Sequence, residues 1–445
     1  MQIVNIICDC NINFNRLKYV IDFINEHPLC PNGVKLLLNS GNEGYKKIYY
    51  TVENESGYII PVQNLLFSNK KEFTGDLFIN EYEFNGNKYY SVEKIRKLPY
   101  FFNVENIFAF DIFEAIFFHI SRYEEYFFSK NHLDKHGRMK SGAQLLVKNN
   151  LHHIPVVDHL ISGFFESLGF DIQERRTDFN LTHDIDIIRK FDSNFKLVKS
   201  IGRVLLMGLG IKGVKKIVNS FIISKKDKTR DPYYTYEWLF REENYFKKKI
   251  VFLVAGGKTR QDLYNKNYLK ELPDIIQKAK DKSYDIGLHP SYNAYNYKLM
   301  FEKELKLLKS ESKNDIKYVR IHFLRLDLQK TFNIIEDLGF EYDSTLGYND
   351  EIGFRCGTGF EYFPYNFEEE KRWEFKELPL VIMDSALLKS CKDDNTCFEE
   401  KIDNFLGWNK YNTQITFNFH NSTFDRIKIS EKIRNSYIDL IKLTK

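Results

Sequence analysis

The chain has no long uninterrupted run of apolar residues and no recognisable export signal. No stretch approaches the roughly 20 apolar residues that a helix needs to cross a bilayer. The N-terminal segment 1–9 has no basic region followed by an apolar one, as a signal peptide would. These absences argue against a membrane-spanning or exported protein. They predict a cytoplasmic protein, or one at the inner face of the membrane.

Cysteine is scarce and does not occur in pairs at a regular spacing. The six cysteines stand at positions 8, 10, 30, 356, 391 and 397. Cys8 and Cys10 are close together, but no Cys or His pair follows them at zinc-finger spacing. We therefore expect buried, reduced thiols rather than a disulfide framework or a structural zinc site.

An excess of one charge is also missing. The formal net charge is +4, which is too small to indicate a nucleic-acid partner. The apolar content of 43%, with 16% aromatic residues, excludes general disorder. A chain of 445 residues is too long for one ordinary core, so the length predicts two domains.

Residues 1–175 are predicted to form a smaller, mixed α/β domain. Asn85-Gly86 lies between two strand-like runs and predicts a hairpin over 82–90. Asp111 is expected to cap a helix that reaches about Phe128, and a second helix is expected over 155–168. We find no pattern typical of catalysis in this part of the chain.

From residue 176 onwards, predicted strands alternate with predicted helices, which is typical of a parallel sheet or barrel. The strands are expected at 250–254, 284–289, 318–324, 340–345 and 415–420. Apolar residues alternate with polar ones along several of these strands, and the polar set includes His289, Arg320, His322 and His420. Active sites of β/α barrels lie at the carboxyl ends of the strands, so a site is expected there.

The stretch 180–186 combines two nearby carboxylates with a strand pattern. As a strand it would place Asn180, Thr182, Asp184 and Asp186 on one face. The Cα atoms of the two aspartates would lie roughly 7 Å apart. Like charges at this distance resist joint ionisation unless a cation or an arginine lies between them. The pattern predicts a metal ion or a proton-transfer partner. The alternative is an N-cap aspartate beside a solvated one.

Residues 187–230 form a basic, amphipathic insertion. Twelve Lys and Arg residues are opposed only by Asp192 and Asp227, and apolar residues are interleaved with them. Two interpretations remain open. The insertion could lie on an anionic membrane surface as a peripheral contact. It could equally be a helical excursion that packs on its own domain and exposes a solvated basic face.

Five short motifs in the back half occur in the order found in polysaccharide deacetylases, the NodB-homology group of carbohydrate esterase family four. The motifs lie at 182–186, 289–293, 320–322, 339–345 and 417–420. The resemblance covers about 176–445 and implies a distorted (β/α) barrel that uses a divalent metal, with Zn²⁺ expected, to remove an acetyl group from a sugar. The front half resembles an uncharacterised domain that precedes deacetylase domains in some bacterial surface-polysaccharide proteins.

The resemblance assigns catalytic roles to four residues. Asp184 matches the catalytic base, and Arg320 matches the arginine that orients it. Asp343 matches the carboxylate of the fourth motif, and His420 matches the histidine that acts as general acid. The family usually has adjacent aspartates, whereas Ile185 separates them here, so base and ligand could be exchanged.

The metal ligands depart further from the family pattern. Asp186 and His289 match the metal-binding carboxylate and the first metal histidine, but Asn293 stands where the second histidine is expected. Asparagine oxygen is a poor ligand for zinc. We expect Asp186, His289 and His322 to bind the metal, with Asn293 as the competing candidate.

The leading hypothesis is a metal-dependent hydrolase that removes an acetyl or similar acyl group from a sugar during bacterial surface-glycan assembly. Its substrate would be nucleotide-linked, lipid-linked or an oligosaccharide, and Ser291, Arg355 and Asp384 are expected to line the substrate cleft. Two alternatives remain. One is a catalytically impaired glycan-binding or assembly protein with the same fold. The other is a different amide hydrolase on the same barrel.

Overall fold

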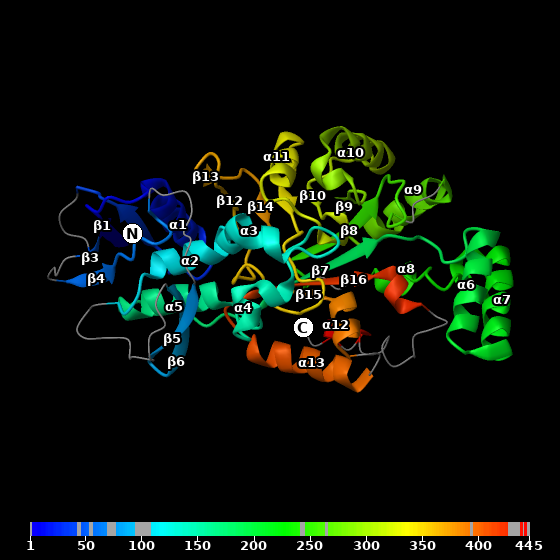
Figure 1. The fold of residues 1–445 in the computed structure, drawn as a ribbon, viewed down its shortest axis with the longest axis horizontal. Coiled ribbons are helices and arrows are strands. Elements are labelled where there is room, and N and C mark those ends of the chain that lie inside the picture. The colour runs from blue at the N-terminus through cyan, green and yellow to red at the C-terminus, as the bar shows by residue number, and fades with distance from the viewer. Residues whose placement is uncertain are drawn as a thin grey trace. The chain divides into compact units, whose positions relative to one another are not determined.

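The computed structural model of the chain falls into two compact units (Figure 1). The structure describes residues 2–41, 46–52, 57–68, 77–93, 108–240, 245–262, 266–391, 395–425, 437–438 and 440–442. The first unit comprises 1–177, 353–381 and 408–415, and the second comprises 178–352, 382–407 and 416–445. The sequence predicts a single boundary near residue 175. Instead, two later segments that were expected in the barrel belong to the first unit.

The first unit contains a parallel sheet with the strand order β2-β1-β3-β4 and an antiparallel hairpin, β5-β6. Its strands are β1 (Gln2–Ile7), β2 (Val34–Leu38), β3 (Lys46–Thr51), β4 (Tyr58–Pro61), β5 (Phe78–Phe84), β6 (Asn87–Glu93), β12 (Tyr365–Asn366), β13 (Lys371–Arg372) and β14 (Lys376–Glu377). Its helices are α1 (Phe14–Glu26), α2 (Ile112–Ile120), α3 (Tyr123–Phe128), α4 (Leu145–Lys148) and α5 (Val156–Ser167). Asn85 and Gly86 both have positive φ, which confirms the predicted hairpin turn. The helix predicted from Asp111 to Phe128 is broken at Arg122, where φ is 56°.

Polar contacts between residues far apart in sequence tie the late segments into the first unit. Arg16 pairs with Glu370, with 2.7 Å between Nη2 and Oε1. The hydroxyl of Thr413 donates to Oδ2 of the buried Asp158 at 2.7 Å. Such contacts have no local sequence signature, so motif order alone could not predict them.

The second unit is built on parallel strands in the order β11-β10-β9-β8-β7-β16-β15, which form a curled half-barrel (Figure 1). The strands are β7 (Asp178–Ile185), β8 (Lys248–Val254), β9 (Asp285–His289), β10 (Tyr318–Val319), β11 (Tyr342–Asp343), β15 (Ile382–Met383) and β16 (Gln414–His420). The helices are α6 (Asn194–Leu206), α7 (Gly210–Lys226), α8 (Tyr236–Leu239), α9 (Lys266–Asp281), α10 (Lys298–Ser312), α11 (Lys330–Asp337), α12 (Asp384–Cys391) and α13 (Asn395–Trp408). The predicted alternation of strands and helices around a parallel sheet is confirmed. The sequence also predicts a terminal helix capped near Ser430, and residues 426–436 lie outside the described part of the chain.

The predicted insertion 187–230 forms a helical hairpin. Helices α6 and α7 lie side by side (Figure 1) around a small core of Phe191, Val204 and Ile217. Among the described residues, no helix is both long enough and apolar enough to span a bilayer.

One expectation about cysteine is wrong. Cys391 at the end of α12 and Cys397 near the start of α13 form a disulfide, with their Cα atoms 5.5 Å apart. The other cysteines are free thiols, as expected. Two cysteines six residues apart have no distinctive pattern in sequence. Only the positions of the two helix ends bring their side chains together.

Candidate metal and acid–base site

The polar face of β7 places Asp184 at the centre of a buried hydrogen-bond network. Its Oδ1 accepts a hydrogen bond from Nη1 of Arg320 at 2.9 Å, and its Oδ2 accepts one from Nδ2 of Asn418 at 2.9 Å. Burial acts to raise the pKa of Asp184, but the charges of Arg320 and His420 lower it below its usual value. Asp184 is therefore held ionised and in a fixed orientation.

Arg320 follows β10 and is completely buried. Besides Asp184, its guanidinium donates to the Thr182 hydroxyl at 2.8 Å and to both the carbonyl and the hydroxyl of Ser344. It also lies over the ring of Phe252, 4.3 Å from the centroid. The strand predicted over 318–324 ends at Val319, so Arg320 reaches Asp184 from beyond the strand end.

Asp343 lies beside the segment that carries Arg320. Its Oδ1 accepts a hydrogen bond from the Thr345 hydroxyl at 2.5 Å, and that hydroxyl accepts one from the backbone N–H of Ile321 at 3.0 Å. The sequence predicts a catalytic Asp343. These contacts connect it to the backbone next to Arg320, which gives it a positioning role.

Asp186, His289 and His322 come together as the sequence expects. Each offers a ligand atom, and these atoms all lie within 4.8 Å of one another, so the group could hold a metal ion. Oδ1 of Asp186 lies 3.3 Å from Nε2 of His289 and 3.7 Å from Nε2 of His322. This oxygen is buried and has no hydrogen-bond partner in the described structure. Two imidazoles and one carboxylate form a ligand set typical of catalytic zinc.

The orientation of His289 strengthens the case for a cation. Its Nδ1 lies 2.6 Å from the carbonyl oxygen of Arg320, which can only accept, so Nδ1 carries the proton. In the neutral ring, Nε2 then presents a lone pair towards the carboxylate of Asp186. Two lone pairs that face each other in a buried site repel unless a cation or a proton lies between them.

His322 lies beside a carboxylate that the sequence reasoning missed. Instead of lying on a strand, His322 begins a single 3₁₀ turn, and its Nδ1 lies 3.6 Å from Oδ1 of Asp262. Asp262 is buried and accepts hydrogen bonds from the backbone of Tyr292 and Thr259. Burial lowers the pKa of His322, but Asp186 and Asp262 together raise it to about 9.

This pKa predicts that cation binding strengthens as the pH rises. A ligand histidine must lose its proton, and His322 holds that proton up to about pH 9. We expect the apparent dissociation constant of Zn²⁺ to fall about tenfold per pH unit between pH 7 and 9. Chelator-buffered titrations would measure it. Asp262→Asn removes one of the two negative charges that raise the pKa of His322. In this variant, the affinity should therefore stop rising at a lower pH. A constant affinity over this range would contradict the assignment of His322.

The motif 289–293 contributes only its first residue to the cluster. Ser291, which was expected to line the substrate cleft, is buried, and its hydroxyl donates to Oε1 of Glu304 at 2.5 Å. Asn293, the competing metal ligand, is exposed, and its Oδ1 accepts a hydrogen bond from Arg325 at 3.4 Å. Glu304 is a buried partner for which the sequence has no signal.

His420 faces both aspartates from the end of β16. Its Nε2 lies 3.8 Å from Oδ2 of Asp184 and 4.0 Å from Oδ2 of Asp186. Its Nδ1 donates to Oδ1 of Asp384 at 2.8 Å, and its backbone N–H donates to the other oxygen at 2.6 Å. Burial lowers the pKa of His420, but Asp384, Asp186 and Asp184 raise it to about 10. Asp384 was expected to contact substrate. Instead, it is buried and orients His420.

Arg355 belongs to the first unit, not to this site. Its Nε and Nη2 donate to the two oxygens of Glu125 at 2.9 and 2.6 Å, and both side chains are buried. Burial raises the pKa of Glu125, but Arg122 and Arg355 lower it to about 2. The structure thus shows Arg355 in a buried ion pair within the first unit, and its place in a substrate cleft stays a prediction.

Arg355→Ala is therefore expected to affect stability. Removal of one partner of a buried pair should lower the free energy of unfolding by about 3 kcal/mol. Arg372→Ala, which breaks the half-exposed pair with Glu26, is the control and should cost below about 1 kcal/mol. Urea unfolding would measure both. Unchanged stability combined with a raised KM would instead indicate that Arg355 contacts the substrate.

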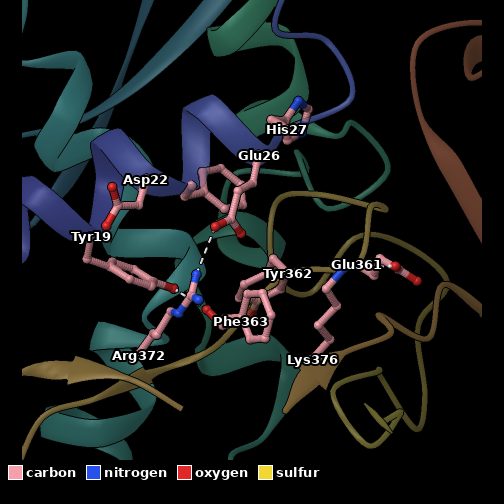
Figure 2. Close-up of a pocket in the computed structure, with 10 residues that line it drawn as sticks. Tyr19, Asp22, Glu26, His27, Glu361, Tyr362, Phe363, Arg372 and Lys376 are labelled. Carbon is pink, nitrogen blue, oxygen red and sulfur yellow. Dashed lines mark hydrogen bonds and ion pairs between the residues drawn. The ribbon is translucent and has the colours of Figure 1, made fainter. Parts of the chain in front are cut away.

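A separate pocket lies in the first unit (Figure 2). Arg372 crosses it, with Nη1 2.8 Å from Oε1 of Glu26 and the guanidinium over the ring of Phe363. The hydroxyl of Tyr19 donates to the carbonyl of Phe363. The polar groups of these side chains are paired with one another. The cluster of Asp186, His289 and His322 does not line this pocket.

A model of a family of unknown function, DUF7033, matches residues 6–171, which is less than half of the chain. None of the curated proteins matches. Among solved structures, the chain is similar to a protein from Mycobacterium smegmatis described as a polysaccharide deacetylase. The identity is 11% and the TM-score 0.35, over 60% of this chain and 84% of the other.

Two further solved structures show likenesses of the same low level. Puue allantoinase has 12% identity and a TM-score of 0.34, over 60% of this chain and 83% of its own. BA3943 from Bacillus anthracis, described as a pseudoenzyme of the CE4 family, has 9% identity and a TM-score of 0.28, over 61% and 64%. At these values the function has to be argued from the residues of the site.

Proposed function

We propose that this protein is a metal-dependent hydrolase that removes an acetyl or similar acyl group from a sugar. The observation that carries the proposal is the convergence of three groups within the second unit. These are the cation-binding set Asp186, His289 and His322, the fixed carboxylate of Asp184, and the protonated His420. A hydrolase of this kind needs a Lewis acid, a base and an acid within reach of one bond.

The cation would be held by Oδ1 of Asp186 and the Nε2 atoms of His289 and His322. When bound, a divalent ion such as Zn²⁺ supplies Lewis acidity to the acyl carbonyl and to the attacking water. The carbonyl of Arg320 and the carboxylate of Asp262 hold the two rings in the orientation that this requires.

Asp184 acts as the general base. Its Oδ2 lies 4.0 Å from Nε2 of His289, so it borders the space in which the water must lie. Arg320 and Asn418 keep the carboxylate ionised and prevent it from rotating. Both effects are needed, because a base must be deprotonated and correctly oriented before it can take a proton from water.

His420 acts as the general acid. Its raised pKa keeps the ring protonated at neutral pH, and Asp384 holds Nδ1 so that Nε2 points towards the two aspartates. The proton on Nε2 passes to the leaving amine or alkoxide when the acyl bond breaks. Without this transfer, the leaving group would depart as an unstable anion.

For the substrate, we propose an acetylated sugar in surface-glycan assembly, either nucleotide-linked, lipid-linked or part of an oligosaccharide. This choice rests on the order of the deacetylase-like motifs. It is tested by incubating the Zn²⁺-loaded full chain with N- and O-acetylated sugars of each kind and measuring free acetate. We expect release that a chelator stops and Zn²⁺ restores. Tight sugar binding without any release would instead support a glycan-binding protein.

A further inference from the structure

The end of the α6–α7 hairpin exposes a cluster of large apolar side chains. Five of the seven residues over 205–211, which we call the apolar tip, have large hydrophobic side chains, and the other two are glycines that form the turn. The exposed fractions are 57% for Leu205, 91% for Leu206, 59% for Met207, 55% for Leu209 and 76% for Ile211. Single exposed apolar residues are common, but a cluster of this kind marks an interaction surface.

The exposed apolar surface extends from the tip along α6. Phe195 and Val198 are 75% and 66% exposed, and they share one helical face with Leu206. The core of the hairpin does not use these side chains, because Phe191, Val204 and Ile217 fill it from the opposite faces. The outward apolar face is therefore not needed to hold the two helices together.

The two helices that carry this apolar face contain basic residues and no acidic ones. Residues 193–226 contain eight basic residues and no Asp or Glu. The basic residues are Lys196, Lys199, Arg203, Lys212, Lys215, Lys216, Lys225 and Lys226. Lys199 and Arg203 interrupt the apolar face on α6, and Lys212 follows the tip directly.

We propose that the apolar tip inserts into the headgroup region of an anionic membrane while the lysines and arginines around it contact lipid phosphates. Apolar side chains at the end of the hairpin and basic ones along its two helices match the two layers of such a surface. A second copy of the chain is a poor partner, because two predominantly basic hairpins would face each other. This inference goes beyond the proposed function and does not depend on it.

The first test is co-sedimentation of the full chain with vesicles of phosphatidylcholine alone or with 30% phosphatidylglycerol. Leu206→Asp places a charge at the most exposed apolar position and should weaken binding to the anionic vesicles at least tenfold. Leu299→Asp, on α10 in the same unit and 67% exposed, is the matched control and should leave binding unchanged. Thermal melting checks that both variants fold.

The second test addresses charge. Lys212→Gln with Lys215→Gln should weaken binding roughly 25-fold, or about fivefold per lysine, and the effect should shrink in high salt. The control is Lys303→Gln with Lys306→Gln on α10. Equal binding to neutral vesicles, no binding to either kind, or a dimer that Leu206→Asp dissociates in the absence of lipid would each overturn the proposal. Acetate release from a soluble sugar is a separate assay, so failure here leaves the proposed function standing.

Discussion

Asp184→Asn is expected to abolish measurable acetate release while leaving the cation bound. General base catalysis contributes about 10²- to 10⁴-fold to rate, and the carboxamide cannot take a proton from water. The size of the side chain is nearly unchanged, and the amide oxygen can still accept the hydrogen bond from Arg320. The cation ligands Asp186, His289 and His322 are not altered. A rate loss without a loss of metal would separate the base from the ligands.

The same substitution also tests which aspartate is the base. The residue Ile185 between the two aspartates leaves open that Asp184 is the metal ligand and Asp186 the base. In that case, Asp184→Asn would remove the metal and Asp186→Asn would not. Zinc content of the purified variants, measured by elemental analysis, decides between the two. Thermal melting is needed as a control, because the new amide nitrogen would face Nδ2 of Asn418, and two donors cannot bond to each other. Activity close to that of the native chain would contradict the proposed mechanism.

His322→Ala is expected to cost at least a hundredfold in Zn²⁺ affinity. Loss of a residue that only orients a ligand already costs about 10- to 100-fold, and loss of a ligand should cost more. Asn293→Ala is the matched control. Because Asn293 is exposed and bonded to Arg325, its removal should leave the affinity within about twofold of native. Competition with a chromogenic chelator measures both variants at one fixed pH.

The opposite result would favour the spacing known from the deacetylases. If Asn293→Ala releases the metal and His322→Ala does not, the ligand set would be Asp186, His289 and Asn293. The triad in the structure would then be a proton-sharing cluster. His289→Ala is a useful third variant, because His289 belongs to both ligand sets. Either set therefore predicts that this variant loses the metal.

The alternation of strands and helices and the polar face of β7 could be predicted because each depends on a local pattern. Alternation with a period of two placed Asn180, Thr182 and Asp184 on one face, and the structure shows all three in one network with β16 and Arg320. The same reasoning was less reliable after Val319. His322 reaches the site from a 3₁₀ turn rather than from a strand. The alternation of side chains along a strand therefore does not explain why His322 lies beside Asp186.

The residues that sequence reasoning missed share one property. They are Asp262, Glu304 and, for its orienting role, Asp384. Each is a single acidic residue that contacts its partner only after the chain has folded. A lone acidic residue in a loop or at a helix start has no period and no spacing. Asn418 was on a predicted polar face, but nothing in the sequence pairs it with Asp184.

The interrupted first unit has a consequence for biosynthesis. When a ribosome has released residues 1–177, Arg16 and Asp158 still lack Glu370 and Thr413, which are translated much later. The nascent N-terminal portion therefore stays incompletely packed until most of the second unit has been synthesised. We therefore expect a prematurely terminated chain to leave the buried Arg16 without its carboxylate partner and the first unit open to proteases.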